Sequence, residues 1–141
     1  MPEKRTIEKA REDLREGKSP STAAGEFVHE EIEHVREGKH GVRSPKQAIA
    51  IGLSKARRAG IPLAPPKEGT TTARTRKRAQ RDYRKGQSKP KRKSSSNRSR
   101  AREAALKKEP TSTVSHQTLS RQARGATKRR KTGSASLRRA A

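Results

Sequence analysis

The sequence predicts a mostly α-helical protein with a small two- or three-helix module over residues 1–66 and a long, largely disordered basic tail over residues 67–141. Charge is distributed unevenly, because the first part holds 13 basic and 10 acidic residues and the second holds 25 basic and 4 acidic residues. Large apolar side chains are concentrated in the first part. A hydrophobic content of 26% with a formal net charge of +24 is typical of disorder, since too little apolar surface offsets the entropy of ordering.

Two amphipathic helices are expected first along the chain. One lies near residues 6–16, where Ile7 and Leu14 recur at helical spacing. The next lies near residues 22–37, where five apolar side chains around Phe27 fall within an arc of about 140° on a helical projection. Each pattern indicates a helix that buries one face against a neighbour.

A third helix is expected near residues 45–59, and its start is the best marked in the chain. Ser44, Pro45 and Gln47 supply an N-cap serine, a proline at the first helical position and a glutamine at the third. Gly52 and the surrounding alanines form a low-relief face that lets another helix approach closely. This helix is basic and the preceding one acidic, so we expect the two to pack as an antiparallel pair.

The basic tail begins after a proline-rich boundary at Pro62, Pro65 and Pro66, which cannot continue a helix. Its helical patterns are short and poor in large apolar residues. We therefore expect nascent helices that form on a partner rather than stable packing. These nascent helices are expected near residues 72–85, 98–108 and 115–130.

One stretch of the N-terminal module resembles a known family. The sequence GKHGVRSPKQAIAIGLSKARRAG runs from Gly38 to Gly60. Its core from Lys46 onward is similar to the KQAIAIAL-S-x-A-R-K-A-G hallmark of a small bacterial family of unknown function. It departs at Gly52, where alanine is common, and at Lys55, where an acidic residue is common. The resemblance implies a bacterial protein, nucleoid-associated or DNA-binding, located in the cytoplasm at the nucleoid and without catalytic residues to carry over.

The basic tail predicts a nucleic-acid partner, because a cationic segment displaces condensed counterions from a duplex. Fifteen of its 25 basic residues are arginine, which contacts phosphate bidentately. Phe27 and Tyr83 are too few aromatic residues for the stacking platforms of single-strand and RNA binders. Sequence-tolerant binding of double-stranded DNA is therefore expected. An RNA- or ribosome-associated basic protein and a protein of unknown function with a solvated tail are the alternatives.

The side chains expected to bind nucleic acid share a positive charge, and all but two of them lie in the basic tail. They are Arg57, Arg58, Arg74, Arg76, Lys77, Arg78, Arg81, Arg84, Lys85, Lys89, Lys91, Arg92, Lys93, Arg98, Arg100, Arg102, Arg121, Arg124, Lys128, Arg129, Arg130, Lys131, Arg138 and Arg139. The helical module is expected to supply a homodimer contact or a contact to another protein.

Enzymatic and metal-dependent functions are not expected from the sequence. The chain has no cysteine, and therefore no thiolate nucleophile or thiolate metal ligand. His29 and His34 are five residues apart and point about 140° away from each other on a helix, unlike a zinc-binding His-Glu-x-x-His pair. Glu31 and His34 match half of a di-iron helix motif, which needs a second copy. His40, in a glycine-flanked turn, is a candidate phosphate contact.

No cofactor, small-molecule substrate or membrane partner is expected either. No glycine-rich phosphate loop is present. The longest strongly apolar stretch, Ala48–Leu53, is far shorter than the ~20 residues of a membrane span. No apolar segment typical of a secretory signal follows the N-terminus.

Overall fold

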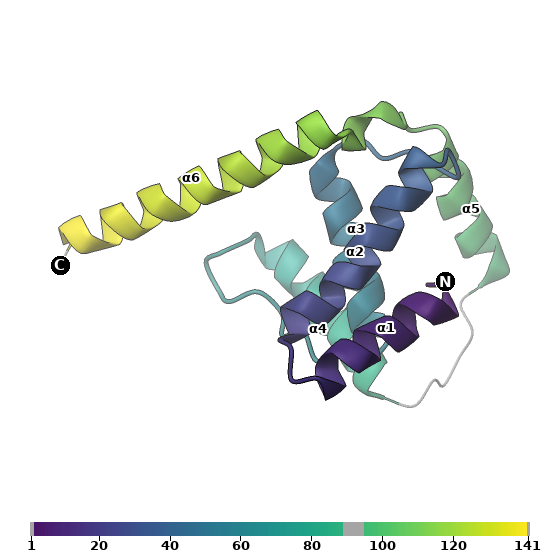
Figure 1. The fold of residues 1–141 in the computed structure, drawn as a ribbon, viewed down its shortest axis with the longest axis horizontal. Helices are drawn as coiled ribbons and strands as arrows, with labels where there is room; N and C mark the ends of the chain where they lie inside the picture. Colours follow the sequence, from purple (N-terminus) through teal and green to yellow (C-terminus); the bar gives the residue numbers. More distant parts are fainter. Residues whose placement is uncertain (1, 89–94, 141) are drawn as a thin grey trace.

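The computed structural model describes residues 2–88 and 95–140, with side chains described up to residue 133. Within these residues the chain forms six α-helices and one short 3-10 helix. They are α1 (Lys4–Arg15), α2 (Pro20–Arg36), α3 (Pro45–Arg58), α4 (Ala73–Gln87), α5 (Ser96–Lys107), η1 (Ser112–Val114) and α6 (His116–Ala140). α2 packs against α1 and α3, and α4 packs against α3. α6 extends away from the rest of the molecule as a long single helix (Figure 1).

Side-chain caps fix the starts of three helices. The hydroxyls of Ser19, Ser44 and Thr72 accept hydrogen bonds from backbone N–H groups in the first turns of α2, α3 and α4. Gln47 Oε1 also accepts a hydrogen bond from the Arg43 N–H at 2.6 Å, which closes the start of α3. These bonds satisfy N–H groups that have no partner within the helix.

The first part of the core lies between α1, α2 and α3. Its buried residues are mostly alanines grouped around one phenylalanine: Ala10, Ala23, Ala24, Phe27, Ala56 and Ile61. Ile7 and Leu14 pack against this cluster, so α1 is docked on the module. Gly52 of α3 lies against the backbone of Val28 in α2, where an added Cβ would be 2.6 Å from the Val28 Cα. Small side chains thus let the helices pack closely.

A second part of the core joins the two halves of the chain. It consists of Val35, Val42, Ala48 and Val114, all fully buried. Val114 belongs to η1, in the segment that the sequence assigned to the tail. Two hydrogen bonds hold this segment against the turn before α3: the Val42 N–H donates to the Pro110 carbonyl at 2.9 Å, and Thr113 Oγ1 donates to the Val42 carbonyl at 2.7 Å.

α4 docks on α3 through a small residue and a buried carboxylate. Ala79 and Asp82 are 5% and 7% exposed. Ser54 Oγ donates a hydrogen bond to Asp82 Oδ2 at 2.6 Å, and Arg58 Nε donates to Asp82 Oδ1 at 2.8 Å. The buried charge of Asp82 is therefore compensated by a cation and a hydroxyl from the facing helix.

The prediction of a long, largely disordered tail was wrong. Helices α4, α5 and α6 cover most of residues 73–140, and α4 and η1 contribute buried residues to the packing. Large apolar side chains are scarce there, but Ala79, Gly86 and Val114 fit closely against α3 and the preceding turn. Counting large apolar residues therefore underestimates how much of this half can pack.

The contact of Gly86 with α3 supports a stability prediction. A Cβ at Gly86 would lie 1.7 Å from the Arg57 carbonyl oxygen, so Gly86→Ala must push α4 away from α3. We expect this variant to lower the free energy of unfolding by about 2–3 kcal/mol, measured by urea denaturation. Gly25→Ala is the matched control, because a Cβ there meets no atom within 4 Å. It is expected to gain about 0.5–1 kcal/mol from helix propensity. Equal stability of the two variants would contradict the docking of α4.

Candidate nucleic-acid interface

The outward side of α4 carries six cations, which we call the α4 cationic face: Arg74, Lys77, Arg78, Arg81, Arg84 and Lys85. At 100° per residue they fall within an arc of about 120°, which excludes Ala79 and Asp82 on the side that is buried against α3. All six side chains are exposed. Within the described residues, the ion pairs of α4 join Asp82 to Arg58 and Arg76 to Glu68. The α4 cationic face is therefore available to an external anion.

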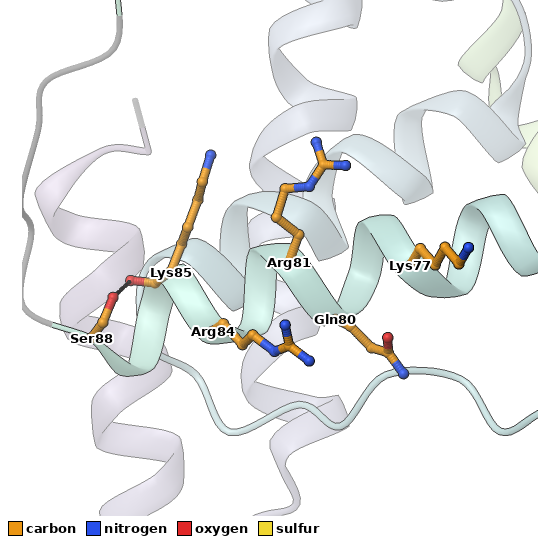
Figure 2. A pocket seen from close by; sticks show the side chains of 6 residues that line it. All are labelled: Lys77, Gln80, Arg81, Arg84, Lys85 and Ser88. Carbon is orange, nitrogen blue, oxygen red and sulfur yellow. Dashed lines mark hydrogen bonds between the residues drawn. The ribbon is translucent and has the colours of Figure 1, made fainter.

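Part of this face surrounds an open hollow of about 440 Å³. Its lining residues are Lys77, Gln80, Arg81, Arg84, Lys85 and Ser88. Figure 2 shows Arg81 and Lys85 pointing to one side of the helix, while Arg84 and Gln80 point to the other. Ser88 Oγ donates a hydrogen bond to the Lys85 carbonyl at 3.2 Å at the end of the helix. Cations that spread to both sides of an open surface suit an extended polyanion better than a small molecule.

α6 carries a second exposed row of cations. Arg121, Arg124, Lys128 and Lys131, the α6 cationic row, fall within an arc of about 80° on a helical projection. All four are exposed, and the sequence of α6 contains no acidic residue. At 1.5 Å per residue, this 25-residue helix is about 38 Å long. A hydrogen bond from the Thr118 N–H to Ser115 Oγ caps its first turn.

α5 adds three more exposed arginines, Arg98, Arg100 and Arg102. None of the described residues of α5 is buried. The helix is attached to the core at its end, where the Gly41 N–H donates a hydrogen bond to the Leu106 carbonyl at 2.9 Å. α5 therefore presents charge to solvent while its C-terminal end is held in place.

Arg57 and Arg58 do not lie in the same environment as the other predicted contacts. Arg57 is 8% exposed, and its guanidinium donates hydrogen bonds to the carbonyls of Leu63 and Ala64. Burial lowers the pKa of Arg57 from its ordinary value, and the nearby charge of Asp82 opposes this effect. The burial of Arg57 conflicts with the expected nucleic-acid contact. We therefore assign its guanidinium a structural role. Arg58 forms an ion pair with Asp82, and 45% of its side-chain surface remains exposed.

Arg129, Arg130 and Arg76 are placed by the structure outside the two rows. Arg129 and Arg130 are exposed on other sides of α6, and Arg76 is half-buried beside Glu68. Six of the predicted contacts cannot be placed: Lys89, Lys91, Arg92 and Lys93 lie outside the described residues, and so do the side chains of Arg138 and Arg139.

Sequence reasoning missed a buried acidic residue in α2. Glu31 is 1% exposed and contacts Lys55 Nζ at 2.6 Å and His40 Nε2 at 2.8 Å. The imidazole of His40 thus faces inward rather than toward a phosphate, contrary to its proposed role. An acidic residue inside an otherwise apolar arc of α2 was the one signal in the sequence that could have indicated this burial.

The fold and its surface define a small all-α protein with a core of small residues and cations on the outward sides of its last three helices. Residues 4–68 match a family model described as "Family of unknown function (DUF6496)". The match agrees with the resemblance to a family of unknown function, covers α1, α2 and α3, and ends before α4. No curated protein and no solved structure matches the chain. Among the described residues, no helix has both the length and the apolar character needed to cross a membrane.

Proposed function

We propose that this protein binds double-stranded DNA with little sequence preference, through the phosphates, in the manner of a nucleoid-associated protein. The observation that carries the proposal is the exposure of the α4 cationic face and the α6 cationic row. Phosphate contacts of this kind supply affinity through counterion release and carry little sequence information.

The acidic residues of the C-terminal half support this proposal, because each is already engaged by a basic residue. Glu68 pairs with Arg76, Asp82 with Arg58, Glu103 with Lys107 and Glu109 with Arg43. None of these pairs uses a member of the α4 cationic face or the α6 cationic row. The positive charge of these helices is therefore not neutralised by the described carboxylates.

The lengths of the two basic surfaces also fit a duplex. Residues 74–85 of α4 rise about 16 Å along the helix axis, and residues 121–131 of α6 rise about 15 Å. A duplex carries one phosphate charge per ~1.7 Å, so several phosphates lie within reach of each surface.

The aromatic residues favour a duplex over a single strand. Phe27 is fully buried in the core and Tyr83 is half-buried on α4. Single-strand binders stack bases on exposed aromatic rings. The two aromatic residues of this chain are not arranged as such a platform.

Equilibrium binding of the full chain to unrelated duplexes over a range of salt tests the proposal. Six or more phosphate contacts are expected to give a slope of log K against log salt of about −5 or steeper. Affinities for the different duplexes are expected to agree within a few-fold. A slope near zero would contradict the proposal. A strong preference for one duplex would also contradict it. Tighter binding to structured RNA of equal charge would favour an RNA- or ribosome-associated role instead.

A further inference from the structure

Titratable side chains gather where the end of α2 meets the turn before α3. The cluster comprises Glu3, Glu30, Glu31, His34, His40 and Lys55. Glu30 and Glu31 are 7% and 1% exposed, and the side chains of His34 and His40 are largely buried. None of these residues belongs to the proposed DNA-binding surface.

The hydrogen bonding of His40 leaves one of its ring nitrogens free to bind a cation. His40 Nδ1 lies 3.0 Å from the Gly41 carbonyl oxygen, which can only accept, so Nδ1 carries the proton in this bond. His40 Nε2 lies 2.8 Å from Glu31 Oε1. That oxygen is buried and has no hydrogen-bond partner among the described residues, so the ring does not aim an N–H at it. Glu31 Oε1 is therefore a buried carboxylate oxygen close to a ring nitrogen but without a hydrogen bond, and a cation bound between the two would give it a partner.

A second buried carboxylate oxygen of the cluster, on Glu30, is also without a hydrogen-bond partner among the described residues. Glu30 Oε1 accepts a hydrogen bond from the Glu3 N–H at 2.8 Å, whereas Glu30 Oε2 is buried and unpartnered among the described residues. His34 Nε2 lies 3.2 Å from Glu3 Oε1 and 3.8 Å from Glu30 Oε1. The imidazole centroids of His34 and His40 are 6.4 Å apart.

The cluster holds more carboxylates than permanently charged cations, because its two imidazoles are charged only when protonated. Three carboxylates meet one closely placed ammonium, Lys55, which contacts Glu31 Oε2 at 2.6 Å. Among the carboxylates of the cluster, Lys39 pairs with the exposed Glu3 alone, at 3.8 Å, and its shorter pair, at 3.1 Å, is with Glu37 outside the cluster. Buried carboxylates need a compensating charge, and a divalent cation supplies it.

We propose that Glu31, His34 and His40 bind a zinc ion. One ligand atom from each of the three lies within 4.8 Å of the other two, so small side-chain movements bring them around one ion. Two imidazole nitrogens and a carboxylate oxygen are ligands that zinc prefers. Glu31 offers Oε1 while Oε2 stays on Lys55. The bond from His40 Nδ1 to a backbone carbonyl is the outer contact that orients ligating histidines.

The sequence predicts no metal site, because His29 and His34 diverge along one helix and Glu31 with His34 supplies only half of a di-iron motif. The structure pairs His34 with His40, which comes from the turn beyond the helix. The ion would tie α2 to the turn that precedes α3, and its role is to stabilise this part of the fold. The proposal is independent of DNA binding.

Calorimetric titration and thermal unfolding of the full, untagged chain test this site. Any bound metal is first removed from the protein with a chelator. Zn²⁺ alone is then expected to bind with a stoichiometry of one and to raise the Tm by several degrees. Mg²⁺ alone is expected to do neither. His34→Gln and His40→Gln are each expected to weaken zinc binding by about 10-fold or more. His29→Gln is the matched control, because His29 is exposed on α2, the helix that carries His34. This variant is expected to bind zinc as the unaltered chain does.

The histidine ring signals in NMR spectra of the unaltered chain provide a test that needs no variant. Zinc is expected to shift the rings of His34 and His40 and to leave those of His29 and His116 in place. An absence of zinc-dependent stabilisation overturns the proposal. Shifts confined to His29 or His116 also overturn it, as does undiminished binding in both the His34 and His40 variants.

Discussion

A variant in which four residues of the α4 cationic face become glutamine (K77Q, R81Q, R84Q and K85Q) is expected to lose most of its affinity for duplex DNA. Each lost phosphate contact removes about 0.9 from the slope of log K against log salt, so the slope should become shallower by about 3–4. At roughly 0.1 M salt this corresponds to a loss of about 10²–10³-fold. The four side chains are exposed, so the fold should be retained, which circular dichroism and urea denaturation check. Fluorescence anisotropy over a salt series measures the affinity.

A control variant removes the same charge from another helix. Four exposed cations of α1 (K4Q, R5Q, R11Q and R15Q) lie among acidic residues of the same helix. Their neutralisation is expected to change the affinity by less than about 5-fold, since long-range effects of exposed charges are screened by salt. Equal losses in the two variants would mean that affinity follows net charge alone, which contradicts an interface on α4.

Neutralising the α6 cationic row (R121Q, R124Q, K128Q and K131Q) is the second change with a large expected effect. A loss of about 10²–10³-fold is expected for the same electrostatic reason. The helix content of the free chain should not fall, because the variant removes like-charge pairs at three- and four-residue spacing, such as Arg124 with Lys128. Circular dichroism of the free chain and anisotropy with DNA measure the two effects separately.

An arginine-to-lysine variant distinguishes charge from detailed geometry in α6. R121K and R124K together keep the charge of the row and are expected to bind within a few-fold of the unaltered chain. A loss as large as that of the neutral variant would show that guanidinium geometry is required, which contradicts sequence-tolerant phosphate binding. Unchanged binding by the neutral variant would remove α6 from the interface.

The sequence predicted the helices of the N-terminal module within a few residues, because their signals are local. Ser44 and Gln47 mark the start of α3 by hydrogen bonds to nearby backbone groups. The apolar arc around Phe27 indicates which side of α2 is buried. Caps and periodicity depend on residues a few positions apart, so they can be recognised without knowing the tertiary structure.

Contacts between distant residues could not be predicted in the same way. Val114 joins Val35 and Val42 across more than 70 residues, and nothing local marks it as a core residue. Asp82 looks like a surface residue of a basic helix until Ser54 and Arg58 are brought to it. These contacts arise from tertiary packing, so local patterns predict only a nascent helix near residues 72–85 in a disordered tail, not a docked α4.

The contact of His40 with Glu31 has the same origin. A helical projection of α2 cannot show a side chain that comes from the following turn. The carboxylate and the imidazole meet only after that turn packs against α2. The charge of the sequence predicts a nucleic-acid partner, which stays a prediction, whereas the buried polar cluster could not be predicted from local patterns.

Lysine acetylation of the DNA complex, mapped by mass spectrometry, tests the central claim most directly. The claim is that DNA covers the outward sides of α4 and α6. Four lysines are exposed in the free chain: Lys77 and Lys85 of α4, and Lys128 and Lys131 of α6. Each is expected to be acetylated several-fold more slowly when duplex is added. The exposed Lys4 of α1 is expected to be acetylated at the same rate with and without DNA. Protection of Lys4 with none on α4 and α6 would contradict the claim.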